Sequence, residues 1–187
     1  MRADRSIFLL LDGSILSKMV LTFDLNSRSE RDTQELGYFI GSLLEQGDFI
    51  PLTGELGAGK TAISQGIAWG LGVEEYAHSP TFMLVNQYIG RVPLYHSDLY
   101  RIDDLGEIED LGIEEMLQDG VCLVEWAEKA SSVLPPENLH IEIYTTGPNE
   151  RHFHFKATGD RYNSLLNHLV STIREQLPRV LTGDGTQ

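Results

Sequence analysis

The sequence predicts an α/β fold, a three-layer sandwich in which helices cover both faces of a mixed central sheet. Short apolar runs typical of buried strands alternate with longer segments whose apolar residues recur at helical spacing. Two later segments alternate apolar and polar residues, which indicates strands with one solvent-exposed face. The 187 residues are enough for one domain with a sizeable core.

Six elements are predicted in the first half of the chain. Ser27, with Glu30 three residues later, forms the capping-box pattern that begins a helix, and Gly47 marks its end. Ile63, Ile67 and Leu71 are spaced four apart, as on one face of a helix. In chain order we expect a strand at 19–25, a helix from Ser27 to Gly47, a strand at 48–53, a helix at 61–71, and strands at 81–88 and 92–96.

The second half begins with an acidic segment. Residues 103–119 carry eight acidic side chains and no basic one, and the apolar residues among them favour short helices over disorder. Gly147-Pro148-Asn149 supplies a turn between the two alternating segments. After the acidic segment we expect a strand at 120–125, a short helix at 127–131, strands at 139–143 and 152–156, and an amphipathic helix at 161–177.

The segment Gly54-Glu55-Leu56-Gly57-Ala58-Gly59-Lys60-Thr61 matches the phosphate-binding pattern G-x-x-x-x-G-K-[ST]. Its glycines let the backbone wrap closely around an anion, with N–H groups pointing at phosphate oxygens. A strand before the loop and a helix after it place the positive end of the helix dipole under the phosphates. We therefore predict a nucleotide site in which Lys60 reaches the β and γ phosphates and Thr61 offers its hydroxyl to Mg²⁺.

This motif makes the predicted fold a P-loop NTPase-like sandwich, with a single P-loop ATPase domain at 19–178. Residues 1–18 are expected to be a flexible N-terminal extension, and 179–187 a loose tail. The apolar run at 7–11 is too short for a secretory signal or a membrane span, so we expect a cytoplasmic protein. The chain lacks the Asn-Lys-x-Asp pattern of GTPases, which favours ATP over GTP.

The net charge of −14 argues against direct, stable binding to nucleic acid, because no cluster of lysine and arginine offsets the 28 acidic residues. Docking to a basic face of a partner protein stays compatible with this charge. The only cysteine, Cys122, lies in an apolar run and is expected to be a buried, unreactive thiol.

Nucleotide hydrolysis also requires a carboxylate near Mg²⁺ and a group that orients the attacking nucleophile. Asp98 and Glu125 each follow an apolar strand. Either could hold Mg²⁺, directly or through water, and the alternative is that one of them is only a helix cap at the exit of a strand. The segment Ser79-Pro80-Thr81 approaches the γ-phosphate as a switch or simply begins a strand. Trp126 contacts the nucleotide or a partner, or packs in the core, and His96 is the one histidine singled out, for its proximity to Asp98.

These motifs occur in an order that resembles the TsaE family, small ATPases of tRNA threonylcarbamoyladenosine synthesis. The resemblance covers roughly residues 20–145. Its motifs are the P-loop, then Ser79-Pro80-Thr81-Phe82 with Leu84-Val85 and Tyr88, then Tyr95-His96-Ser97-Asp98-Leu99-Tyr100-Arg101, then Glu109 with Leu111-Gly112-Ile113, and finally Leu123-Val124-Glu125-Trp126.

The resemblance implies slow ATP hydrolysis that supports threonylcarbamoyl transfer to adenosine 37 of tRNA, in a complex with TsaD and TsaB. The tRNA would be reached only indirectly, through that complex. The site residues implied are Thr61 and Glu125 as Mg²⁺ ligands, Gly57, Ala58, Gly59, Lys60 and Thr61 around the phosphates, Asp98 as the essential aspartate, Thr81 as the switch threonine, Trp126 near the active site, and residues 30–33 near the base.

Two other functions are compatible with a P-loop. A kinase of a small metabolite needs an acceptor pocket and usually an arginine-bearing lid, and residues 103–119 occupy a lid-like place without an arginine. A nucleotide-binding adaptor would bind ATP without any chemistry.

Overall fold

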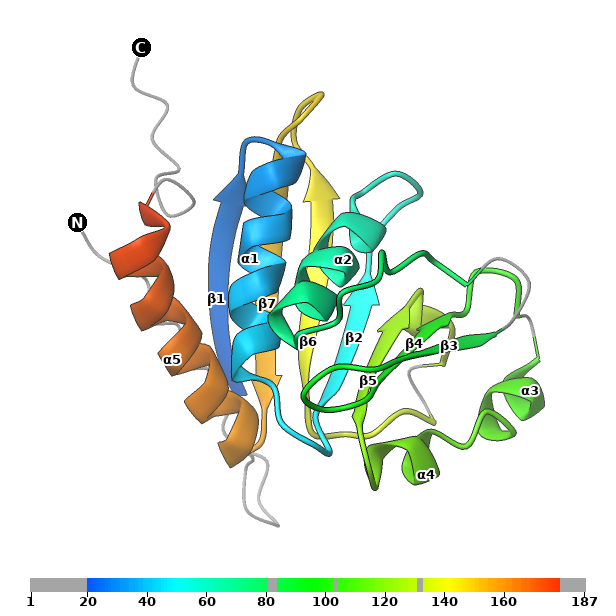
Figure 1. Ribbon diagram of the computed structural model, residues 1–187. Coiled ribbons are helices and arrows are strands. Elements are labelled where there is room, and N and C mark those ends of the chain that lie inside the picture. The colour runs from blue at the N-terminus through cyan, green and yellow to red at the C-terminus, as the bar shows by residue number, and fades with distance from the viewer. Residues whose placement is uncertain (1–19, 81–83, 103, 131–132, 179–187) are drawn as a thin grey trace, which may run out of the picture.

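The computed structural model describes residues 20–80, 84–102, 104–130 and 133–178. The strands are β1 (Val20–Ser27), β2 (Phe49–Thr53), β3 (Val85–Tyr88), β4 (Leu94–Asp98), β5 (Val121–Glu125), β6 (Asn138–Thr145) and β7 (Arg151–Thr158). The helices are α1 (Glu30–Leu43), α2 (Lys60–Gly70), α3 (Leu105–Glu109), α4 (Ile113–Leu117) and α5 (Asp160–Gln176), with the 3-10 helix η1 (Ala127–Ala130). The strands form a seven-stranded sheet in the order β1-β7-β6-β2-β5-β4-β3 (Figure 1).

The centre of the sheet is parallel and its edges are antiparallel. β2 pairs in parallel with both β5 and β6, and β4 pairs in parallel with β5. β7, β1 and β3 are added in antiparallel orientation. The predicted mixed sheet is therefore confirmed, and the carboxyl ends of β2, β5 and β4 meet at one edge.

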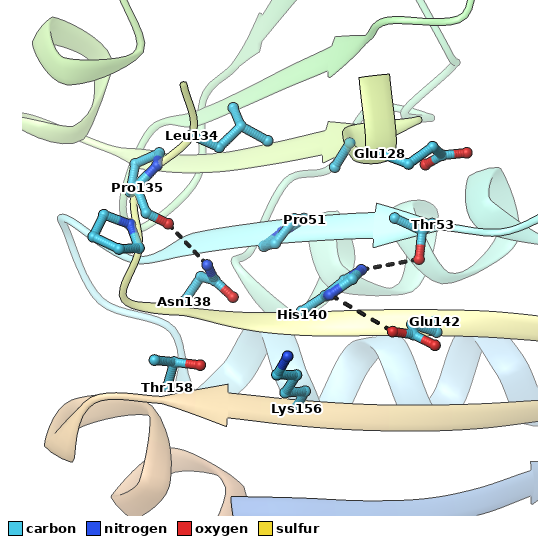
Figure 2. A pocket seen from close by; sticks show the side chains of 12 residues that line it. Pro51, Thr53, Glu128, Leu134, Pro135, Asn138, His140, Glu142, Lys156 and Thr158 are labelled. Carbon is cyan, nitrogen blue, oxygen red and sulfur yellow. Dashed lines mark hydrogen bonds and ion pairs between the residues drawn. The ribbon is translucent and has the colours of Figure 1, made fainter. Parts of the chain in front are cut away.

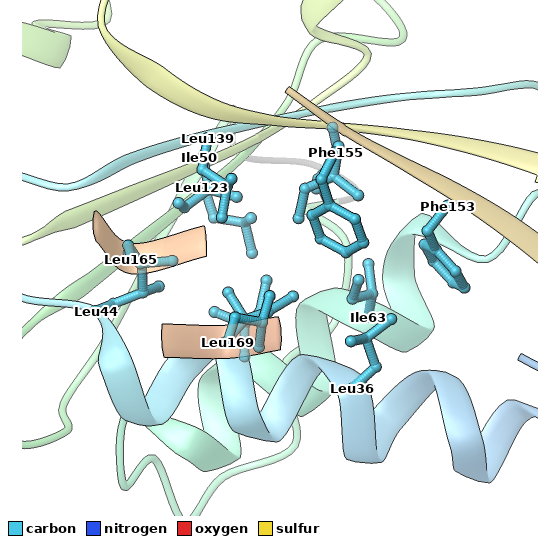
Figure 3. Close-up of a cluster of buried hydrophobic side chains, with 14 of the residues drawn as sticks. Leu36, Leu44, Ile50, Ile63, Leu123, Leu139, Phe153, Phe155, Leu165 and Leu169 are labelled. Atoms are coloured by element: carbon cyan, nitrogen blue, oxygen red, sulfur yellow. The ribbon is translucent and has the colours of Figure 1, made fainter. Parts of the chain in front are cut away.

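Helices α1, α2 and α5 cover one face of the sheet, where the main hydrophobic core lies (Figures 1 and 3). Phe153 and Phe155 of β7 meet Leu36 of α1, Ile63 of α2 and Leu169 of α5 within this cluster. Strand alternation explains the arrangement, because every second residue of a strand points to the same face.

The opposite face of the sheet has a thinner third layer. Phe49 of β2 and Val124 of β5 pack there in a smaller apolar cluster with Ile113 of α4 and Ala127 of η1. Over β6 and β7 this face carries partly exposed polar side chains such as His140, His152 and His154. The three-layer sandwich is thus most complete over the parallel strands that carry the candidate site.

Several predicted boundaries differ from the structure. Ser27 is the last residue of β1 and bonds Thr33, whereas the N-cap of α1 is Ser29, whose hydroxyl accepts from the N–H of Asp32. β3 begins at Val85, and the earlier part of the strand expected at 81–88 falls largely outside the described residues. The expected extension at 1–18 and tail at 179–187 also lie outside them. In the part of the chain that the structure describes, no helix combines the length and apolar character needed to cross a membrane.

Four glycines bring α1 and α2 into backbone contact. Gly37 and Gly41 of α1 face Gly66 and Gly70 of α2. A Cβ atom on Gly66 would lie 2.1 Å from the carbonyl oxygen of Gln34, and the other three positions are equally crowded by backbone atoms. This packing fixes α2, whose first turn follows the P-loop, against its neighbour.

We predict that Gly66→Ala destabilises the protein although alanine is the better helix former. The gain in helix propensity is about 1 kcal/mol, whereas overpacking against a backbone oxygen that cannot swing aside costs about 1–3 kcal/mol or more. Chemical denaturation should therefore show a net loss of unfolding free energy. Gly106→Ala is the matched control, because a Cβ there meets nothing closer than 3.4 Å. Equal stability of both variants would contradict the proposed packing.

Cys122 is buried in β5, and burial raises the pKa of its thiol to about 12. Because the thiolate is the reactive form, we predict that Ellman's reagent at pH 8 leaves native Cys122 unmodified and modifies it fully in urea. Rapid stoichiometric reaction of the native protein would show that β5 is accessible and would contradict the placement of this residue.

Candidate nucleotide-binding site

The P-loop connects β2 to α2, as predicted. Gly54, Gly57 and Gly59 have positive φ angles of 146°, 80° and 105°, a region that favours glycine. Gly59 is the N-cap of α2 and has no side chain that could bond the first-turn N–H groups. Those groups and the helix dipole are therefore directed at the loop, where an anion would lie.

Lys60 lies across the inner side of the loop. Its ammonium donates to the carbonyl oxygens of Gly54 at 2.6 Å and Glu55 at 3.0 Å, and it lies 3.7 Å from the centroid of the Trp126 ring. Burial lowers the pKa of Lys60, although the charges of Glu125, Glu128 and Asp98 oppose that effect. The side chain is thus held by two carbonyl oxygens and an aromatic face.

Asp98 and Glu125 lie side by side, because they are register partners at the carboxyl ends of the parallel strands β4 and β5. A cavity of about 310 Å³ contains both. It is lined by Leu56, Gly57, Ala58, Gly59, Lys60, Thr61, Ser79, Asp98, Tyr100, Glu125 and Trp126. The structure therefore brings together the residues predicted around the phosphates and Mg²⁺, except Thr81, which lies outside the described residues. Residues 30–33, predicted near the base, do not line this cavity.

Asp98 connects two loops at the rim of this cavity. One carboxylate oxygen accepts from the backbone N–H of Tyr100 at 2.9 Å, and the other accepts from the hydroxyl of Ser79. Because Ser79 is the first residue of the predicted switch segment, this bond ties the start of that segment to the end of β4. This position suits a residue that orients a nucleophile or a water molecule.

Two buried side chains, His96 of β4 and Ser64 of α2, hold the Glu125 carboxylate. Its Oε1 lies 2.9 Å from His96 Nε2 and 2.9 Å from Ser64 Oγ. His96 was singled out from the sequence for its proximity to Asp98, but its partner is Glu125. Ser64 was missed, although its spacing of four residues from Lys60 on a predicted helix places both on one face.

Trp126 adopts φ = 60°, the one positive φ among the described non-glycine residues. Its ring lies 4.8 Å from that of Tyr100, centroid to centroid. A left-handed conformation in a bulky residue is strained and persists only where surrounding contacts impose it. In this conformation the indole lies over the Lys60 ammonium and lines the same cavity.

Arg151 supports the P-loop from outside. Its guanidinium donates to the carbonyl oxygens of Ala58 at 2.8 Å and Gly57 at 3.3 Å, and also to the turn that precedes β7. No sequence pattern indicated this residue, because it is more than ninety positions from the loop. Beside it lies a second cavity of about 240 Å³, lined by Glu30, Thr33, Gly57, Gly59, Ala62, Asn149 and Arg151.

A larger cavity of about 700 Å³ lies on the other face of the sheet (Figure 2). His140 bonds Thr53 inside it, near Glu142 and Lys156. The glycine loop and the Asp98 carboxylate are not among its lining residues. Its mixture of both charge signs favours no single class of ligand, so size alone does not make it the nucleotide site.

The oxygen donors beside the P-loop suit Mg²⁺ better than a transition metal. The Thr61 hydroxyl and the Glu125 carboxylate line one cavity, and Glu125 Oε2 has no hydrogen-bond partner among the described residues. Within that same set, no group of three or more histidine, cysteine, aspartate or glutamate side chains could hold a metal ion. A site of this kind fits a cation that takes its other ligands from phosphates and water.

The chain is similar to known proteins over most of its length. The family model described as "Threonylcarbamoyl adenosine biosynthesis protein TsaE" matches residues 27–153. The chain is 43% identical over 140 residues to the tRNA threonylcarbamoyladenosine biosynthesis protein TsaE of Bacillus subtilis, covering 74% of this chain and 87% of that protein. It is 42% identical over 126 residues to the protein of the same name from Treponema pallidum, covering 67% and 93%.

A solved structure extends the likeness to three dimensions. The crystal structure of Bacillus subtilis YdiB superposes with a TM-score of 0.70 at 36% sequence identity, covering 83% of this chain and 98% of that one. The matched family segment spans the P-loop, Asp98, Glu125 and Trp126. The chain therefore belongs to the TsaE family, whose members are named for the biosynthesis of threonylcarbamoyladenosine in tRNA.

Proposed function

We propose that this protein binds ATP and Mg²⁺ at the P-loop and hydrolyses ATP slowly, in support of threonylcarbamoyl transfer to adenosine 37 of tRNA by TsaD and TsaB. The observation that carries the proposal is the meeting of the P-loop, Asp98 and Glu125 at the carboxyl ends of three neighbouring parallel strands. Ligands of α/β sheets bind at such edges.

In this proposal the triphosphate lies along the P-loop, in the 310 Å³ cavity, which we call the phosphate cavity. The first-turn N–H groups of α2 receive the phosphate oxygens, and Lys60 exchanges its carbonyl partners for the β and γ phosphates. Trp126 supports the Lys60 ammonium, which lies 3.7 Å from the centroid of its ring in a cation–π contact. Bound Mg²⁺ would neutralise developing charge on the phosphates, with Thr61 and Glu125 as its protein ligands.

The nucleoside is assigned to the smaller cavity beside Arg151. Glu30 and Thr33 line it, as the resemblance implied for the start of the first helix. Gly57 and Gly59 line both this cavity and the 310 Å³ cavity, so one nucleotide can span the two. Arg151 keeps the intervening loop carbonyls turned away from the phosphates.

We assign to Asp98 and Ser79 the task of orienting the attacking water molecule. Asp98 lies beside Glu125 and bonds Ser79, so its carboxylate is in a position to orient a water molecule next to the Mg²⁺ site. None of the described arginines lines the phosphate cavity. A basic group from TsaD or TsaB would complete the site, in keeping with the net charge of −14.

We predict that Lys60→Ala lowers ATP hydrolysis and tRNA modification together, by roughly 100-fold or more, because it removes a positive charge from the transferred phosphate. Both rates would be measured side by side, with the chain alone and with TsaD, TsaB and tRNA. Lys156→Ala on the opposite face of the sheet is the control and should leave both rates unchanged.

Three outcomes would contradict parts of this proposal. Absence of saturable ATP binding, with partners present or absent, would contradict the nucleotide site. Equal turnover alone and with partners would contradict partner dependence. Transfer of labelled γ-phosphate to a metabolite rather than to water would establish a kinase instead.

A further inference from the structure

We propose that His96 is a positioning residue, which holds the Glu125 carboxylate in the orientation needed for Mg²⁺. The inference rests on the proposed function, because it assigns a residue to the magnesium site. It is drawn from a buried network of three polar side chains, His96, Glu125 and Ser64, under the P-loop.

The network is shielded from water. The exposed fractions are 0% for His96, 0% for Ser64 and 2% for Glu125. The imidazole Nε2 lies 2.9 Å from Glu125 Oε1. A carboxylate that binds Mg²⁺ is ionised and can only accept, so the proposed role requires that Nε2 carries the proton of this bond. In such surroundings a hydrogen bond to a charged group is stronger than in water.

Ser64 cannot replace His96 as the donor. Its hydroxyl lies 2.8 Å from the carbonyl oxygen of Lys60 and 2.9 Å from Glu125 Oε1. A hydroxyl has one proton, so it can be donated to only one of these acceptors at a time. His96 is therefore the donor dedicated to Glu125.

Both contacts fall on the same carboxylate oxygen. Oε1 lies within hydrogen-bond distance of His96 Nε2 and Ser64 Oγ, whereas Oε2 has no hydrogen-bond partner in the described part of the chain. Glu125 lines the phosphate cavity together with Thr61. The network thus fixes one oxygen and leaves the other for a cation, as outer residues commonly do around metal ligands.

Among the described residues, the His96 side chain has no hydrogen bond other than the one to Glu125. The second ring nitrogen, Nδ1, is buried and has no partner among the described residues. Burying an unpaired polar atom carries a free-energy cost that an apolar side chain would avoid. Within the described ranges, the hydrogen bond to Glu125 is the polar interaction that offsets this cost.

The test is calorimetric titration of the full chain with ADP, over a series of Mg²⁺ concentrations and in EDTA. In the wild-type protein the affinity for ADP should rise with the Mg²⁺ concentration. We expect His96→Leu to raise, by roughly tenfold or more, the Mg²⁺ concentration at which half of this increase in affinity is reached. His96→Gln should restore wild-type behaviour, because its amide nitrogen can occupy the place of Nε2. His96→Asn should not, because its side chain is one carbon shorter. ADP affinity in EDTA should be the same for all four proteins.

His154→Leu is the matched control. It removes another histidine that bonds a carboxylate, Asp24 Oδ1 at 2.8 Å, on the opposite face of the sheet. It should leave the Mg²⁺ dependence unchanged. Thermal melts would show whether each variant folds, and if His96→Leu does not, the comparison of the glutamine and asparagine variants decides.

The inference is overturned if the leucine variant has wild-type Mg²⁺ dependence, or if glutamine and asparagine behave alike. It is also overturned if ADP affinity falls equally with Mg²⁺ and in EDTA, which indicates a structural role. Each of these results leaves the proposed ATP site intact. A wild-type protein without saturable ADP binding would instead overturn the proposed function, and this inference with it.

Discussion

Parallel pairing of β2, β5 and β4 is the constraint on which the candidate site depends. β2 leads into the P-loop, β5 ends at Glu125, and β4 ends at Asp98, so the pairing fixes where three functional segments leave the sheet. A shift of one residue in the register of β4 or β5 would turn its carboxylate to the other face. The buried apolar residues of these strands hold the register, because the same shift would expose them.

The helices add a second constraint, because they fix the position of the α2 N-terminus, whose N–H groups would bind the phosphates. α2 begins at Lys60 and is fixed against α1 by backbone contact through four glycines. Arg151 holds the preceding loop by donating to the carbonyl oxygens of Ala58 and Gly57. The P-loop is thus supported from the sheet, from a neighbouring helix and from the β6–β7 turn. Such support matters because an oxyanion site works only if its donors are already in place before the ligand arrives.

The sequence was sufficient for the parts of the site that depend on local pattern. Spacing and apolar periodicity predicted the P-loop, the strand ends at Asp98 and Glu125, and the mixed sheet. In the structure the two carboxylates are register partners at neighbouring strand ends of a mixed sheet. The N-cap of α1 was misplaced by two residues, because Ser27 and Ser29 both satisfy the chemistry of a cap and only the extent of β1 separates them. Arg151 and the bond from His96 to Glu125 arise from pairing between distant strands, which no local pattern encodes. Thr81 stays a prediction.

The most direct test of the account is a crystal structure of the protein with Mg²⁺ and a non-hydrolysable ATP analogue. The account predicts phosphate oxygens on the N–H groups of residues 57–61, and Mg²⁺ bonded to the Thr61 hydroxyl and to Glu125 Oε2, with His96 still on Oε1. A nucleotide bound elsewhere, for example in the cavity around His140, would contradict it, as would a cation coordinated without Glu125.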